Sequence, residues 1–426
     1  MKKVVLSLAG VLAAVAFAPE ASALPVFARQ TGMACSACHF NHAPLLNGFG
    51  RAFKSAGYSM MGAQEKVEGE NLSIPDRVNM AILTTTGYEK IHGGAPGASP
   101  GAWTVPSNGG ELSLFMGGRI MDGSGFLAEL GMGGAGAAVG AAKLLYMPEI
   151  TSGTRLGVVF DTNNGQGVAH GFEILNTGAV NVHKIALGQT HINVYSAAQW
   201  LGTNNATTGV SVVGLNDMGF INVTAYDVAP QAMGTGASRM PLTYARAAAT
   251  FDAAGFDMAA GVQRWMGVSD SQQFGAIQNG LNPLQPIAMV PGNYDATVID
   301  LQAQGDLAGM STGLYASYGS APANSMFGAG DAGVAVANIF KSTTLNFGMD
   351  MNVGHELIAR AALRKATNGA DNLSDNAIMV GVIYELAQNF ELHYTHTSQS
   401  GAHWNAVAGV TPLGKSTDSI VAEVLF

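Results

Sequence analysis

The last third of the chain alternates apolar and polar residues along whole strand lengths. From Leu345 to Asn352, leucine, phenylalanine and methionine alternate with asparagine, glycine and aspartate, and Phe390 to Thr397 repeats the pattern. Successive side chains of a β-strand point to opposite faces, so such strands are apolar on one side and polar on the other. The final residues continue this alternation and end at Phe426. Outer-membrane barrels typically close with such a strand.

Composition supports a barrel in a membrane. Charged residues make up only 12% of the chain, about half the usual ~25%. Beyond the N-terminal leader, no apolar run reaches the roughly 18 residues that a membrane-spanning helix needs. Each spanning strand with its connection takes about 20 to 25 residues. We therefore predict an all-β fold, a transmembrane antiparallel β-barrel of about 16 strands over residues 74–426; a soluble two-sheet sandwich is the alternative.

The N-terminus reads as a secretory signal peptide over residues 1–23. Lys2 and Lys3 precede an apolar stretch, and Ala21-Ser22-Ala23 fits a cleavage site. An uncleaved membrane anchor is the alternative, although the apolar stretch is shorter than the ~20 residues of a spanning helix. We expect an exported chain that begins at Leu24.

The sequence Cys35-Ser36-Ala37-Cys38-His39 contains both cysteines of the chain. C-x-x-C-H is the attachment sequence of c-type haem, in which two thiols bond to the porphyrin and the histidine binds the iron. A redox pair, half of a zinc site and an ordinary disulfide are the alternatives. Since the chain has one such motif, we predict one covalently bound haem c.

Residues 24–73 form a separate segment that we interpret as a short cytochrome. Leu45, Leu46, Phe49 and Phe53 recur at helical spacing and predict one amphipathic helix. Some fifty residues are too few to bury a complete core. We therefore expect the barrel lumen to house part of the haem.

Three stretches of this segment carry a family resemblance: Phe27–His39, Pro44–Lys54 and Gly57-Tyr58. They resemble the N-terminus of the fused monohaem cytochrome-porins, outer-membrane proteins that oxidise extracellular ferrous iron. The specific match spans only Phe27–Tyr58, while the rest agrees in length, composition and terminal phenylalanine. The resemblance implies an iron(II) oxidase in the bacterial outer membrane that passes electrons from extracellular Fe(II) to a periplasmic electron-carrier protein. Its cytochrome would lie on the periplasmic side or within the lumen.

The motif makes His39 the proximal iron ligand. For the distal position we rank Met60 first and Met61 second, because a Met/His pair raises a haem potential, which suits a donor as weak as Fe(II). Plain packing is the alternative for either methionine. His42 competes, but if this stretch is helical its ring lies on the same side as that of His39.

Two further groups of residues are candidates for binding. Arg51 and Lys54 can form charge-assisted contacts with haem propionates, and a solvated helix face is the alternative. His393 and His396 have a metal-like spacing, but on a strand their rings face opposite sides. We therefore expect only His393 to face the lumen.

The net charge of −9 favours the approach of Fe²⁺ to acidic loops and lumen, although it also serves solubility. No basic patch indicates nucleic-acid binding. Two other functions remain open: a passive outer-membrane diffusion porin with an accessory haem, and a soluble periplasmic c-type electron carrier. The diffusion porin would be embedded in outer-membrane lipid, whereas the electron carrier would be soluble.

Overall fold

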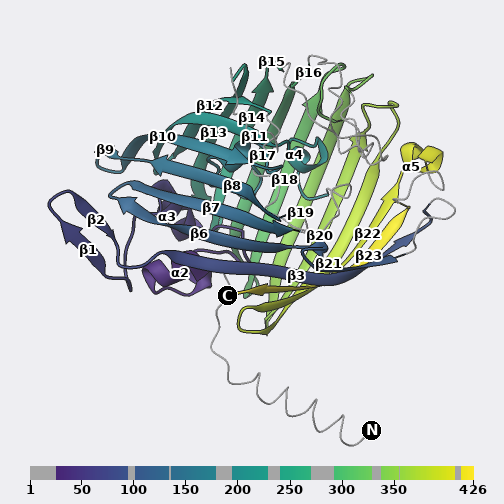
Figure 1. The fold of residues 1–426 in the computed structure, drawn as a ribbon. Coiled ribbons are helices and arrows are strands. Elements are labelled where there is room, and N and C mark those ends of the chain that lie inside the picture. Colours follow the sequence, from purple (N-terminus) through teal and green to yellow (C-terminus); the bar gives the residue numbers. More distant parts are fainter. Residues whose placement is uncertain are drawn as a thin grey trace, which may run out of the picture.

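The computed structural model describes residues 25–94, 101–133, 136–178, 194–228, 240–269, 292–328, 337–354, 356–407 and 414–426. The expected signal peptide, residues 1–23, lies outside these ranges. Most of the described chain forms one closed antiparallel barrel of 16 strands (Figure 1). This confirms the predicted all-β barrel and its strand number.

Each barrel strand pairs with its neighbours along the chain, and β23 pairs with β3 to close the ring. In chain order the strands are β3 (Asn79–His92), β6 (Leu112–Met121), β7 (Ser124–Gly133), β8 (Gly136–Tyr146), β10 (Thr154–Asn163), β11 (Thr207–Asn216), β12 (Gly219–Asp227), β13 (Leu242–Ala253), β14 (Phe256–Met266), β17 (Ala296–Leu307), β18 (Met310–Ala321), β19 (Ser342–Gly354), β20 (Leu357–Thr367), β21 (Asn376–Ala387), β22 (Phe390–Ser400) and β23 (Ser416–Leu425). Short strands extend the ladders or form small hairpins: β1 (Lys66–Gly69), β2 (Leu72–Pro75), β4 (Gly101–Pro106), β5 (Gly109–Gly110), β9 (Glu149–Thr151), β15 (Val268–Ser269) and β16 (Gly292–Asn293).

The two faces of the wall differ as the alternation predicts. On β19, Asn346 and Asp350 point inward and are 0% exposed, whereas Leu345 and Phe347 point outward and are 39% and 44% exposed. Outward apolar side chains recur on other strands, as in Ile299 on β17. The exterior is therefore an apolar surface around a polar interior, which is the arrangement of a transmembrane barrel.

The two ends of the barrel differ in their connections. Tight turns join β13 to β14, β17 to β18 and β21 to β22 at one end, which we call the short-turn end. The opposite end, with connections such as 228–241 and 322–341, is the long-loop end. The polar connections predicted at Lys365–Asp375 and Ser398–Asp418 are shorter in the structure. Here β20 runs on to Thr367 and β22 to Ser400, because their ladder pairings continue beyond the apolar alternation.

The N-terminal segment contains helix α2 (Pro25–Thr31), the 3₁₀ turn η1 (Cys35–Ala37) and helix α3 (Gly48–Ser55). The predicted helix is thus present, but it starts after Leu45 and Leu46. Asn47 caps it, because its side-chain oxygen accepts a hydrogen bond from the Gly50 amide at 2.9 Å. Among the described helices, none is long and apolar enough to cross a membrane.

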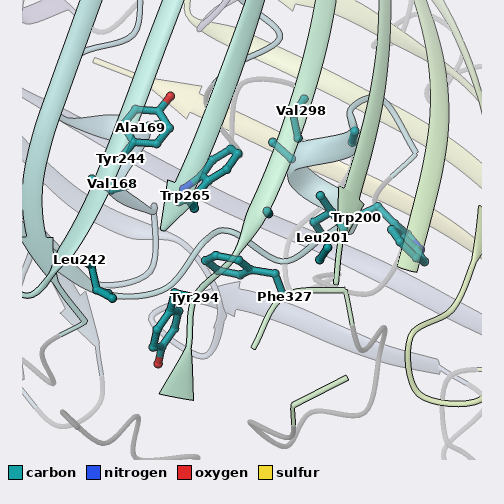
Figure 2. Close-up of a cluster of buried hydrophobic side chains, with 14 of the residues drawn as sticks. Val168, Ala169, Trp200, Leu201, Leu242, Tyr244, Trp265, Tyr294, Val298 and Phe327 are labelled. Atoms are coloured by element: carbon teal, nitrogen blue, oxygen red, sulfur yellow. The ribbon is translucent and has the colours of Figure 1, made fainter. Parts of the chain in front are cut away.

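A second element inside the barrel comes from the connection between β10 and β11. We call residues 164–178 and 194–206 the lumenal insert; it includes the 3₁₀ turn η2 (Val168–His170) and helix α4 (Ala197–Trp200). A capping box between Ser196 and Gln199 starts α4. Figure 2 shows part of the buried cluster in which Trp200 and Leu201 of the insert gather with wall residues such as Trp265. The insert therefore fills lumen space with packed side chains.

Closure of the barrel is testable at Gly87 on β3. A Cβ there would lie 2.5 Å from the backbone oxygen of Ile420 on β23, a distance that real side chains do not tolerate. We expect Gly87→Ala to disturb the closing strand pair and to reduce the heat-modifiable folded band on detergent gels. Gly214→Ala on β11 is the matched control, because its Cβ meets nothing closer than Leu156 at 4.0 Å. Equal folding of the two variants would contradict this assignment of the seam.

Candidate haem-attachment site

One tight turn holds the C-x-x-C-H sequence. The amides of Cys38 and His39 both donate to the Cys35 carbonyl, at 3.0 and 2.9 Å. Both cysteines are free thiols, with Cys35 buried and Cys38 half-buried. The turn thus brings the two thiols and the imidazole together within five residues, as attachment of one porphyrin requires.

Hydrogen bonding orients the His39 ring. Its Nδ1 lies 3.0 Å from the Leu45 carbonyl oxygen. A carbonyl can only accept, so Nδ1 carries the proton and Nε2 keeps its lone pair. Burial, the main influence, lowers the pKa of His39 below its usual 6.5. The ring is therefore neutral near pH 7, the form that binds a metal.

The surroundings of the two cysteines favour the protonated thiols. Burial raises the pKa of the Cys35 thiol from 9.0 to about 12, and the carboxylates of Glu385 and Glu391 act in the same direction. Burial also raises the pKa of Cys38. Within the described ranges, no three His, Cys, Asp or Glu side chains are placed to hold one metal ion together.

Helix α3 packs directly on the attachment turn. A Cβ on Gly50 would fall 2.1 Å from the Cys38 carbonyl oxygen, so only glycine permits this approach. The Asn47 side-chain amide donates to the carbonyls of Ser36 and Ala37 at 3.1 and 3.0 Å. The residue that caps α3 therefore also fixes the turn that bears the cysteines.

Arg51 and Lys54, the predicted propionate contacts, meet protein groups. Arg51 forms an ion pair with Asp257 of β14 and donates to Gln304 of β17 at 3.4 Å. Lys54 donates to the Glu173 carbonyl of the lumenal insert at 2.6 Å. Burial lowers the pKa of Lys54 from 10.5 to about 8. Both cations thus anchor α3 to the barrel interior, and propionate contact stays a prediction.

Met60 and Leu45 pack in different hydrophobic clusters. Met60 packs against the cluster that contains Phe53 and Tyr58. Leu45, whose carbonyl orients His39, belongs to a different cluster. Met61 is half-buried. Iron ligation by either methionine remains a prediction.

His42 is held by its own partners. Its Nε2 lies 3.4 Å from Asp350 on β19, and its Nδ1 lies 2.8 Å from the Ala43 carbonyl. Asp350 also accepts hydrogen bonds from Tyr195 of the lumenal insert and from Arg360 of β20. The sequence did not predict this network. The only signal for it was the inward position of Asp350 on a predicted strand.

The two histidines of β22 face opposite sides, as expected for a strand. His393 lies on the inner face, where its Nε2 is 3.0 Å from Glu391. His396 lies on the outer face, and its Nδ1 is 2.8 Å from Asp418 of β23. Only His393 is therefore close to the lumen.

Several contacts fasten residues 41–54 to the barrel wall and the lumenal insert. Besides Arg51 and His42, the Asn41 amide donates to the Ser311 carbonyl at 3.2 Å. The Leu46 amide donates to Asn176 of the lumenal insert at 2.9 Å, and the Asn176 amide returns a hydrogen bond to the Leu46 carbonyl at 3.1 Å. The segment is thus held between the wall and the insert. Its free thiols and its oriented, neutral imidazole fit a covalently attached haem.

Comparison with known proteins adds a likeness in architecture. No protein-family model matches the chain, and no curated protein matches it. Among solved structures, a variant of the Rhodopseudomonas blastica porin is 13% identical, and the match covers 82% of this chain and 100% of that one at a TM-score of 0.47. A loop-deletion mutant of OmpT, an outer membrane protein of Vibrio cholerae, is 9% identical, with coverage of 82% and 99% and a TM-score of 0.48. The barrel of this chain is established by its own strand pairing.

The double role of Asn47 gives a prediction about local stability. Asn47→Ala removes both the helix cap and the donor to the turn, and loss of a cap costs about 1 kcal/mol. Asn47→Asp keeps the capping oxygen and loses only the donor. Hydrogen exchange of the amides from Cys35 to Ser55 should therefore rise throughout in Asn47→Ala, but mainly before Gly48 in Asn47→Asp. Unchanged protection in both variants would show that Asn47 does not fix the turn.

Proposed function

We propose that this protein is an outer-membrane electron conduit that takes electrons from extracellular Fe(II) and passes them to a periplasmic carrier. The supporting observation is that the turn with the C-x-x-C-H sequence is packed into the short-turn end of a 16-strand barrel. The apolar exterior suits outer-membrane lipid. Short turns of such barrels face the periplasm, which would put the attachment turn on that side.

The bound haem would supply one-electron transfer. Cys35 and Cys38 would hold it covalently, and His39 would bind the iron through Nε2. The Leu45 carbonyl keeps the other ring nitrogen protonated and fixes the ring plane. Met60 or Met61 is proposed for the distal position. The identity of the donor as Fe(II) follows from the resemblance of Phe27–Tyr58 to the fused cytochrome-porins.

A diffusion porin with an accessory haem is the second candidate, because a 16-strand barrel is also the architecture of diffusion porins. One observation weighs against an open pore. Inward side chains from several strands are covered by the N-terminal segment and the lumenal insert and are 0–1% exposed: Asn222, Gln263, Asp300, Asn346 and Asp350. An interior filled in this way suits a cofactor-based conduit better than bulk diffusion.

The first test is whether the chain carries covalent haem. Heat-denatured protein, expressed with haem-attachment machinery, should show a haem-stained band on a gel. Cys35→Ala/Cys38→Ala should abolish that band while the barrel keeps its heat-modifiable mobility. An unstained wild-type protein would remove the haem from the proposal.

The second test separates an electron conduit from a diffusion porin. Protein in liposomes with outward long loops should show haem reduction, read at the ferrous absorption bands, when Fe(II) is added outside. Under the same conditions, the conductance of planar bilayers should stay well below that of an open 16-strand porin. Large conductance together with a haem that Fe(II) leaves oxidised would favour the diffusion porin.

A further inference from the structure

Buried cations of the described chain are paired with carboxylates, except for one lysine. Five arginines that are at most 8% exposed each form an ion pair: Arg51, Arg119, Arg246, Arg360 and Arg364. Lys143 on the inner face of β8 is 5% exposed, and no described carboxylate forms an ion pair with it. A buried charge is normally paired, because removing it from water without a counter-charge is costly. Lys143 therefore lacks the compensation that the buried arginines have.

The Lys143 ammonium contacts the lumenal insert, and a second ammonium lies beside it. Lys143 Nζ donates to the backbone carbonyl of His170. The half-buried Lys54 of helix α3 donates to the carbonyl of Glu173, further along the same insert, at 2.6 Å, and it too has no ion pair with a described carboxylate. The charges of the two lysines act on each other electrostatically, as those of close neighbours do.

The carboxylate of Asp161 faces Lys143 but is bound elsewhere. Asp161 on β10 is the direct cross-strand partner of Lys143. Its Oδ1 lies 2.9 Å from His170 Nδ1, and its Oδ2 accepts a hydrogen bond from Asn163 at 2.8 Å. Asp161 thus lowers the positive potential at this place without forming an ion pair with either lysine.

The two other carboxylates whose charges act on these lysines are Glu173 and Glu129. The Oε2 of Glu173 lies 3.0 Å from Arg246, and its Oε1 accepts hydrogen bonds from the next two backbone amides. Glu129 on β7 accepts hydrogen bonds from Ser113 at 3.2 Å and from Gln166 at 2.8 Å. Each carboxylate near the lysines is therefore bound to other donors.

Hydrogen-bond donors remain on both lysines. An ammonium has three N–H donors. In the described chain, Lys143 and Lys54 each use one of them, for a neutral backbone carbonyl. The donors that are left belong to two neighbouring cations, an arrangement that suits the oxygens of an anion.

We propose that the ammonium groups of Lys54 and Lys143 form a binding site for a carboxylate or phosphate group in the lumen, between α3, β8 and the lumenal insert. The oxygens of that group accept charge-assisted hydrogen bonds from both lysines. The group is either a propionate of the proposed haem or a small anion that enters the lumen, since both present the same oxygens. The propionate source rests on the function proposed above, whereas the anion site itself does not.

Inorganic phosphate is the probe for the site without haem. Its binding to the full chain carrying Cys35→Ala/Cys38→Ala is measured by equilibrium dialysis in a neutral detergent at low salt. Adding Lys143→Met should weaken the tightest phosphate site about tenfold or more, because it removes one of two charged donors at similar side-chain length. Heat modifiability checks that this variant still folds, and its thermal stability in phosphate-free buffer should not fall, because an unpaired buried charge is lost.

Three further variants serve as controls for this binding. Lys143→Arg keeps the positive charge and should retain most of the phosphate affinity. Lys365→Met removes an exposed lysine on the outer face of β20 and should leave the affinity unchanged. Asp161→Asn should raise the affinity, because it removes a negative charge that repels the anion. Lysines that served only as counter-charges of Asp161 would gain no phosphate affinity from that change.

The haem-loaded protein tests the propionate as the source. Its readout is the propionate bending band of the resonance Raman spectrum, which shifts when the hydrogen bonds of the propionate change. Lys143→Met should shift this band, and Lys143→Arg should shift it less. Haem loading should also exclude phosphate from the site if a propionate lies there.

The outcomes separate the two sources and the two proposals. A Lys143→Met effect on phosphate binding with an unchanged propionate band identifies a small anion as the ligand, and a shifted band identifies the propionate. If Lys143→Met changes neither, the anion site is overturned. A chain that carries no haem, or a haem that Fe(II) leaves oxidised, contradicts the function proposed above and leaves the phosphate test in force.

Discussion

The closed ring of backbone hydrogen bonds is the constraint on which the rest of this structure depends. A strand that crosses a membrane must pair all its N–H and C=O groups, so the sheet must close without an edge. Pairing of β23 with β3 achieves this. Closure fixes which side chains face inward, and the charged ones are then too deep to be left unpaired. Arg246 therefore sits between Asp300 and Glu173, and this network in turn holds the lumenal insert.

The sequence predicted most of the barrel because the lipid and the lumen select opposite kinds of side chain. The alternation was clearest in β19 and β22, where both faces carry large or charged residues. It was weak in β8 and β13, where runs of small residues such as Ala247–Ala249 make neither face clearly apolar or polar. These strands form because their neighbours offer a full register of hydrogen bonds, as Ala248 does in pairing with both Phe220 and Gly261. Tertiary context, not local pattern, determines them.

The C-x-x-C-H motif stands out in the sequence because its five residues are contiguous, and in the structure they form one turn. Its surroundings could not be predicted from the sequence, because they come from distant parts of the chain. Arg51 meets Asp257 and Lys54 meets the Glu173 carbonyl, across separations of 206 and 119 residues. Nothing local to α3 distinguishes such anchors from contacts with haem propionates, since both need a cation on one helix face. The Asp350 network could not be predicted either, because the sequence around an inward-facing aspartate does not show which distant residues it contacts.

The N-terminal segment is too short to bury a core of its own, so it must pack against other parts of the chain. Here the barrel and the lumenal insert provide them, through Asp257, Asp350 and Asn176. The same contacts fix the attachment turn at the short-turn end, so the length of the lumen separates it from the long-loop end. The single haem that we propose at one end would not itself span that length. Under the proposed function, an external electron donor would have to travel inward, and the polarity of the lumen wall would help to determine which donors can arrive.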